Sequence, residues 1–339
     1  MRGADLGNFA LVMATGIVSG ALRQDGQLRL SVVLLVIAVA GFVVLASASC
    51  LRAATSPASL RADLACPSRA FTSYAFVAAC VVLAGGFAVA GQRGAAAMLA
   101  AAALAAWLVL TRLIPVRLAT RGRTAITEVN GTWYLWTVGT QSLAIAAAYL
   151  AADGVLPAGL AAVVAIAVWS AGLAGYLVTS TLVLIRLLRA RLGPDDSRAP
   201  YWVAMGALAI SVFAAARILR LAGAPAVMTG RTLITGVAVA CWVLATCLIP
   251  VLAAMTLARL RAGLRAGPWP RYWPGMWVVV FPLGMYSMAG QQFGAAAGLP
   301  LVRHIGAAAV WAAVAAWTLT FAAMAAAPLI RRKEWRSAR

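Results

Sequence analysis

Residues 277–294 read WVVVFPLGMYSMAGQQFG and are apolar enough to cross a bilayer, yet Pro282 stands near their middle. Proline lacks an amide N–H and is expected to kink the helix, and the carbonyl that it frees needs protein or water as a partner. Phe281 lies eight residues after Trp273, an expected cytoplasmic-interface aromatic, and therefore about 12 Å into a ~30 Å hydrocarbon core. This arrangement predicts a pore gate at Phe281 and Pro282, with a core aromatic beside an ordinary kink as the alternative.

The composition indicates a polytopic membrane protein. Of the 339 residues, 64% are hydrophobic and 11% are charged, which is unlike a soluble globule. The net charge of +20 is almost entirely arginine, placed in short loops between apolar segments, where it sets topology. We therefore expect the lipid bilayer as a partner and no nucleic-acid binding. No cleavable signal peptide is evident at the start, so the first apolar segment is expected to be retained.

Ten apolar segments are expected to span the membrane as helices, forming one transmembrane domain over 1–330. The loops after the second, fourth, sixth and eighth segments are rich in arginine, whereas the opposite loops carry few. We expect the protein in the plasma (inner) membrane. The positive-inside rule then places both termini in the cytoplasm, with residues 331–339 as a basic cytoplasmic tail. The segments are about 8–22, 28–51, 71–91, 95–116, 131–151, 159–187, 201–222, 231–258, 273–296 and 304–330.

The segments also repeat. The odd-numbered ones begin near residues 8, 71, 131, 201 and 273, and three of them begin with an aromatic doublet: Trp133-Tyr134, Tyr201-Trp202 and Tyr272-Trp273. This spacing predicts five helical hairpins in series, and repeats in a membrane chain often surround a shared pathway. Glycines at four-residue steps, Gly290, Gly294 and Gly298 among them, are typical of close helix packing.

The spans contain little reactive chemistry. All eight acidic residues lie in loops or termini, there is one histidine, and the five cysteines show no CxxC spacing. Metal sites, proton relays and nucleophilic catalysis need such groups in clusters. We therefore expect no enzyme activity, metal or cofactor. The alternative of another class, a membrane enzyme or a scaffold without transport, would need a reactive constellation or a large soluble segment.

Neutral hydrogen-bonding residues are more frequent in the spans and could replace part of the hydration shell of an anion. Each could instead bond to a neighbouring helix. Arg217 and Arg220 lie near the outer end of the seventh segment, where they would attract anions to a pore mouth or snorkel beside lipid. The pore-lining candidates are Thr15, Ser19, Thr72, Tyr74, Thr137, Thr140, Gln141, Ser211, Tyr286 and Gln291.

Three stretches carry a family resemblance: FALVMATGIVSGAL at 9–22, PYWVAMGALAIS at 200–211 and VFPLGMYSMA at 280–289. They resemble the tellurite-resistance/dicarboxylate transporter family, which includes fungal malate and sulfite transporters and plant slow-type anion channels. The resemblance implies ten helices as five hairpins in quasi-fivefold arrangement, with odd-numbered helices lining a central pore, in a homotrimer. It also implies that the family's occluding phenylalanine falls on Phe281. Relatives tend to have prolines in several inner helices, which segments one, three, five and seven here lack.

Together these features predict transport of small inorganic anions or malate-like dicarboxylates past a phenylalanine constriction. The alternative within transport is a proton-coupled carrier of dicarboxylate, sulfite or tellurite. The absence of carboxylates from the spans favours the uncoupled pathway.

Overall fold

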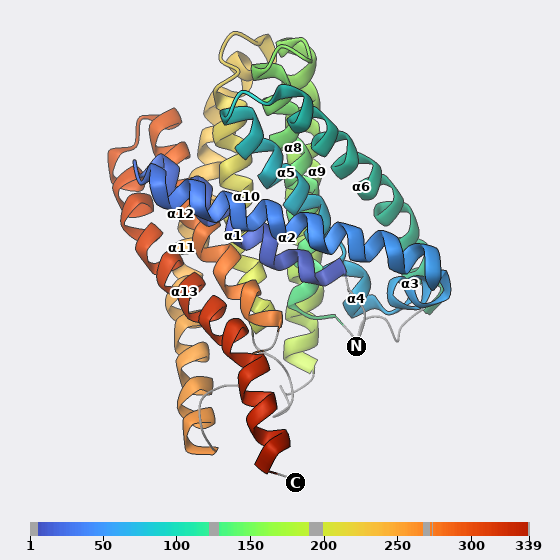
Figure 1. The fold of residues 1–339 in the computed structure, drawn as a ribbon. Helices are drawn as coiled ribbons and strands as arrows, with labels where there is room; N and C mark the ends of the chain where they lie inside the picture. Colours follow the sequence, from blue (N-terminus) through green and yellow to red (C-terminus); the bar gives the residue numbers. More distant parts are fainter. Residues whose placement is uncertain (1–5, 122–128, 190–198, 267–271, 273, 338–339) are drawn as a thin grey trace.

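The computed structural model describes residues 6–121, 129–189, 199–266, 272 and 274–337. Over these residues the regular secondary structure is helical, as the segments predict (Figure 1). Trp273 and the loop residues Glu128, Asp195 and Asp196 lie outside the described residues. The α-helices are α1 (Ala10–Gln24), α2 (Leu28–Thr55), α3 (Pro57–Ala65), α4 (Pro67–Thr72), α5 (Tyr74–Val89), α6 (Arg93–Arg121), α8 (Tyr134–Ala152), α9 (Ala158–Arg189), α10 (Trp202–Leu219), α11 (Pro225–Ala266), α12 (Trp277–Ala297) and α13 (Pro300–Ser337).

Nine helices of the described chain are long and apolar enough to cross a membrane. Helix α12 is also long enough, at 21 residues, but it is more polar because it carries Tyr286, Ser287, Gln291 and Gln292. Two helices extend well beyond their predicted spans: α11 reaches Ala266, and α13 continues to Ser337 through most of the predicted tail. The extension of α11, RLRAGLRA, is rich in alanine, leucine and arginine, and that of α13, RRKEWRS, contains arginine, lysine and glutamate, all of which favour helix.

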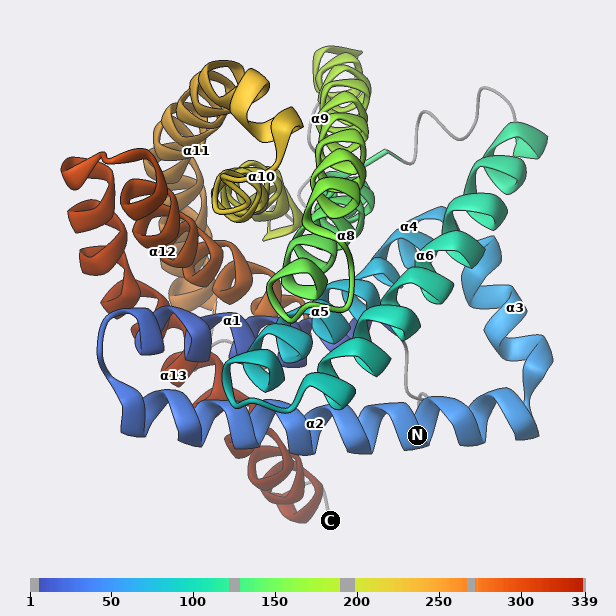
Figure 2. The same cartoon turned by 90° about the horizontal axis from the view of Figure 1, so that it is seen from above.

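Five helices form an inner ring, in which each contacts the next: α1, α5, α8, α10, α12 and back to α1. Each also packs against the helix that follows it in the chain, so that α2, α6, α9, α11 and α13 form an outer layer. Figure 2, the view from above, shows the inner ring surrounded by these outer helices.

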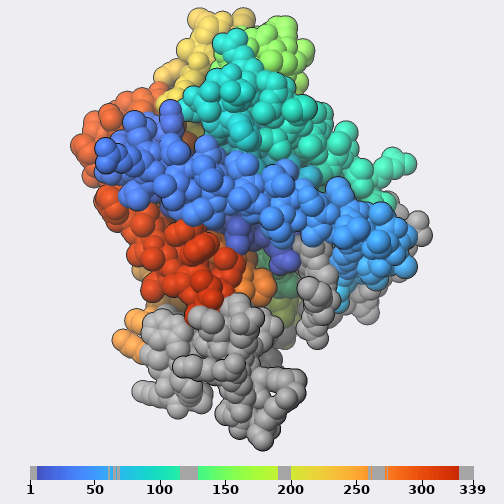
Figure 3. Space-filling view, in the orientation of Figure 1, coloured from blue at the N-terminus to red at the C-terminus, as the bar shows by residue number. Residues whose placement is uncertain are grey.

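Burial separates the two layers. Between 61% and 89% of the most apolar stretch is buried in the four inner spans α1, α5, α8 and α10, against 17–28% in the five outer spans. The outer helices expose large apolar side chains such as Val44, Leu177 and Leu319, and α2 crosses the whole face in Figure 3. An apolar outer surface of this extent suits a lipid environment.

Each inner helix begins at or directly after an aromatic residue: Phe9, Tyr74, Tyr134, Trp202 and Trp277. Three of these residues bond to a hydroxyl of the next outer helix. Tyr74 pairs with Thr111 at 3.0 Å, Tyr134 donates to Ser180 at 3.1 Å, and Trp202 donates to Thr256 at 2.9 Å. The doublets Trp133-Tyr134 and Tyr201-Trp202 are therefore buried anchors that align the start of an inner helix with its outer partner.

The glycines of α12 confirm close packing. A methyl group added at Gly290 would lie 2.9 Å from Cα of Gly306, and one added at Gly294 would lie 2.5 Å from the amide nitrogen of Arg303. Backbones that approach so closely leave no room for a side chain. Gly298 has a different role, because it ends α12 in the left-handed region at φ 68°.

Candidate functional site

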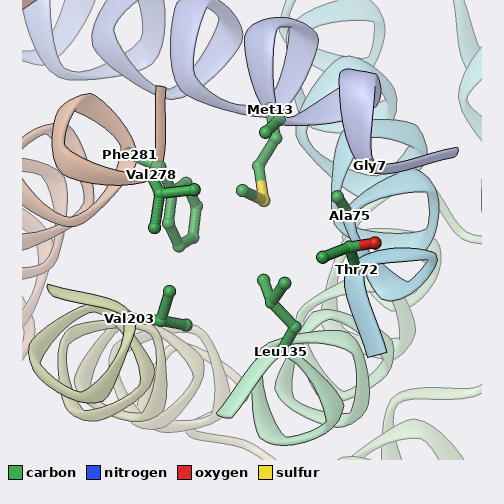
Figure 4. Close-up of a pocket in the computed structure, with 9 residues that line it drawn as sticks. Gly7, Met13, Thr72, Ala75, Leu135, Val203, Val278 and Phe281 are labelled. Atoms are coloured by element: carbon green, nitrogen blue, oxygen red, sulfur yellow. The ribbon is translucent and has the colours of Figure 1, made fainter. Parts of the chain in front are cut away.

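A small cavity lies on the axis of the inner ring, and every inner helix contributes to its wall (Figure 4). Its volume is about 30 Å³, which is room for one or two waters. Thr72 supplies the polar side chain, and its hydroxyl donates to the carbonyl of Arg69 at 2.7 Å. The lining residues are Gly7, Ala10, Met13, Thr72, Ala75, Leu135, Val203, Val278 and Phe281.

The five inner helices all begin at this cavity. Its lining includes the first residue of α1, Ala10, and the second residue of each of the others: Ala75, Leu135, Val203 and Val278. The positive ends of the five helix dipoles therefore lie around this cavity. Each helix N-terminus carries the equivalent of roughly half a positive charge, so the apolar wall is surrounded by a potential that favours an anion.

Phe281 forms part of the cavity wall and is 1% exposed. Its ring lies against Gly206 of α10, where an added methyl group would be 3.3 Å from Cε1 of Phe281 and 3.0 Å from Cγ of Pro282. Helix α12 continues through Pro282. Phe281 lies one turn into α12, nearer the start of the helix than its middle, because the helix begins only at Trp277.

Most of the polar pore-lining candidates bond away from the axis. Of the ten, Thr72 is the one that lines the cavity. Six others bond to outer helices: Thr15 with Trp317, Ser19 with Ser31, Tyr74 with Thr111, Thr140 with Trp107, Gln141 with Trp169, and Tyr286 with Thr246.

Two of the remaining three candidates stay within the inner ring. Ser211 donates to the carbonyl of Ala207 in its own helix, and Gln291 donates to Ser287 and to the carbonyl of Ala21 in α1. The buried Thr137 hydroxyl has no hydrogen-bond partner among the described residues and faces α9, where a methyl group added at Gly175 would lie 3.8 Å from its oxygen. The inner helices are mostly buried, both toward the axis and toward the outer helices, so burial and periodicity do not distinguish a polar residue that faces an outer helix from one that faces the axis.

Arg217 and Arg220 lie three residues apart at the C-terminal end of α10. The Arg217 guanidinium stacks on the ring of Tyr149 in α8, with Cζ 4.2 Å from the ring centroid, and its buried Nε has no hydrogen-bond partner among the described residues. Arg220 is exposed at the end of the helix. Partial burial and the neighbouring Arg217 charge lower the pKa of Arg220. The two positive charges are therefore close enough to act on the same anion.

Comparison with known proteins identifies the family. Residues 4–325 match the family model described as voltage-dependent anion channel. The chain belongs to the voltage-dependent anion channel family. This is the family that the sequence resembles at 9–22, 200–211 and 280–289.

Two curated members of similar sequence are uncharacterized membrane proteins of Mycobacterium tuberculosis, from strains CDC 1551 and H37Rv. Each is 43% identical over 149 residues, which is 44% of this chain and 74% of the relative. The family consists of channels and transporters, and the printed names of these two relatives specify no substrate.

In this member of the voltage-dependent anion channel family, the inner helices contain a second layer of residues, of which the sequence analysis named only Arg217. The cavity residues Ala10, Ala75, Leu135, Val203 and Val278 are each followed, fourteen residues later in the same helix, by a residue near the C-terminal end of that helix: Gln24, Val89, Tyr149, Arg217 and Gln292. Fourteen residues are nearly four helical turns, so each pair shares a helix face about 21 Å apart. Aligning the repeat on the aromatic residue that begins each inner helix would have revealed this layer.

Proposed function

We propose that the chain conducts small anions along the axis of the inner ring and that Phe281 closes this path. The observation that carries the proposal is the position of Phe281: it is buried in the wall of a cavity to which all five inner helices contribute. A cavity of about 30 Å³ is too small for a hydrated ion, and an apolar constriction excludes water as well as ions.

The electrostatics favour anions over cations. Five helix N-termini surround the inner cavity, and Arg217 and Arg220 stand near the other end of the path. Both ion pairs among the described residues are formed by Asp63 of α3, with Arg52 and Arg69, so neither involves Arg217 or Arg220. Positive potential without embedded carboxylates raises the local concentration of anions.

The proposal includes the topology. Helix α12 is the tenth crossing, and the five inner–outer pairs are hairpins in quasi-fivefold arrangement about the path. Both termini lie in the cytoplasm, and the protein resides in the plasma membrane as a homotrimer. The arginine-rich loops and the common start of the inner helices at one cavity support this orientation.

The direct test is uptake of chloride, nitrate and malate into proteoliposomes that contain the purified protein, with protein-free liposomes as the control. We expect uptake of anions down their gradient without a requirement for a proton gradient. Accumulation of malate that depends on a proton gradient would instead identify a coupled carrier. If no anion crosses in wild type or in the Phe281→Ala variant, the proposal is wrong.

The hydrogen bonds between the layers provide a prediction that separates packing from conduction. Tyr286→Phe removes a hydroxyl that pairs with Thr246 of α11 at 2.7 Å. Such bonds contribute about 0.6 kcal/mol on average in membrane proteins. We expect a small decrease in thermal stability in detergent and anion flux within about twofold of wild type. A large change in flux with unchanged stability would place the Tyr286 hydroxyl in the path.

A further inference from the structure

The second layer of the inner helices contains polar groups that lack partners among the described residues. The members of this second layer are Gln24, Val89, Tyr149, Arg217 and Gln292, one from each inner helix. Two pairs form between neighbouring helices: Arg217 stacks on Tyr149, and Nε2 of Gln292 donates to Oε1 of Gln24 at 2.6 Å. Nε of Arg217 and Oε1 of Gln292 are buried and have no hydrogen-bond partner among the described residues.

The register of the helices places these groups at the axis. Arg217 and Tyr149 each follow a cavity-lining residue of their own helix by fourteen residues, which keeps them within about 40° of the same face. Their stacking contact across α8 and α10 agrees with this placement. Gln292, the member of the second layer on α12, follows Phe281 by eleven residues, so the second layer lies about 16 Å farther along the path.

The Tyr149 ring packs against Gly85 of α5, which leaves room for it because glycine has no side chain. A methyl group added at Gly85 of α5 would lie 2.8 Å from the Tyr149 hydroxyl oxygen and 2.9 Å from its Cζ. The ring therefore reaches from α8 to the backbone of α5 while it covers the guanidinium from α10. Three of the five inner helices meet at this one side chain.

We propose that Tyr149 and Arg217 form a second, outer closure of the path, at which an entering small inorganic anion displaces the Tyr149 ring and binds the Arg217 guanidinium. This inference rests on the proposed function for the path itself. The Arg217 charge has no carboxylate partner among the described residues, so its attraction for an anion is uncompensated. A cation–π contact is weaker than a charge-assisted hydrogen bond, which allows the anion to replace the ring. Rotation of the Gln24 and Gln292 amides would offer an N–H₂ group to the same anion.

The first test measures chloride flux in proteoliposomes, with the inner closure already removed by Phe281→Ala. Adding Tyr149→Ala should increase flux at least about fivefold further, because the outer closure is lost as well. Adding Tyr149→Phe keeps the ring and should leave flux at the level of Phe281→Ala alone. Equal flux in all three proteins would overturn the outer closure.

The second test measures anion binding without transport. In detergent, replacing gluconate with nitrate should raise the Tm of the wild-type protein. This increase should exceed the increase in Arg217→Gln by about 2 °C or more. Arg93→Gln, which removes an exposed charge at the start of α6, is the matched control and should behave as wild type. A shift that survives in Arg217→Gln overturns the anion site. A shift that depends on Arg217 in a protein that conducts no anion would retain the site and refute the proposed function.

Discussion

Phe281→Ala is expected to raise chloride and nitrate flux through the reconstituted protein at least about tenfold, which corresponds to a barrier lowered by about 1.4 kcal/mol. The ring is buried in the wall of the axial cavity and fills the space above Gly206. Its removal joins the cavity to the part of the path beyond it. The measurement is initial anion uptake by proteoliposomes of matched protein content.

Controls for this prediction come from the same helix. Phe293 is also a fully buried phenylalanine of α12, but it does not line the cavity. Phe293→Ala should therefore lower stability by about 3–5 kcal/mol, as for other buried phenylalanines, without opening the path. If both variants raised flux equally, general loosening of the helix would explain the result and Phe281 would not be a gate.

Gly290→Leu is expected to lower stability by forcing two helices apart. An added Cβ would lie 2.9 Å from Cα of Gly306 and 3.2 Å from the carbonyl oxygen of Val302, both backbone atoms of α13. Backbone atoms cannot move aside as a flexible side chain can, so α12 and α13 must separate. We expect a loss of at least about 2–3 kcal/mol, measured as a lower Tm of tryptophan fluorescence in detergent.

Gly236→Leu is the matched control for this substitution. Gly236 is an exposed helical glycine of α11, and a Cβ added there meets nothing within 4 Å. Leucine favours helix more than glycine by up to about 1 kcal/mol, so this variant should unfold at the wild-type temperature or slightly above. A comparable loss of stability in both variants would show that the contact with Gly306 is not the cause.

The sequence predicted much of the architecture, because hydropathy reports directly on membrane spans. Segments such as 28–51 and 131–151 correspond to α2 and α8 within a few residues. The helical ends of α11 and α13 were missed, since arginine lowers hydropathy but favours helix. The short helices α3 and α4 were missed because each has fewer than ten residues and little apolar periodicity.

The candidate site was harder to predict. Phe281 was identified because Pro282 follows it, and Arg217 because a charge near a span is rare. Thr140 and Gln141 were assigned to the pore on polarity alone, and the structure shows them bonded to α6 and α9. Tyr149 carries no signal in isolation, since an aromatic residue near the end of a span is usually an interfacial anchor. Its place opposite Arg217 depends on which helices are neighbours.

The most direct test of anion conduction is the reversal potential of Phe281→Ala in a planar bilayer with a tenfold gradient of potassium chloride. With the inner closure removed, the five helix N-termini and Arg217 should select the anion, so the potential should approach the equilibrium potential of chloride. A potential near that of potassium would contradict an anion path along the axis of the inner ring.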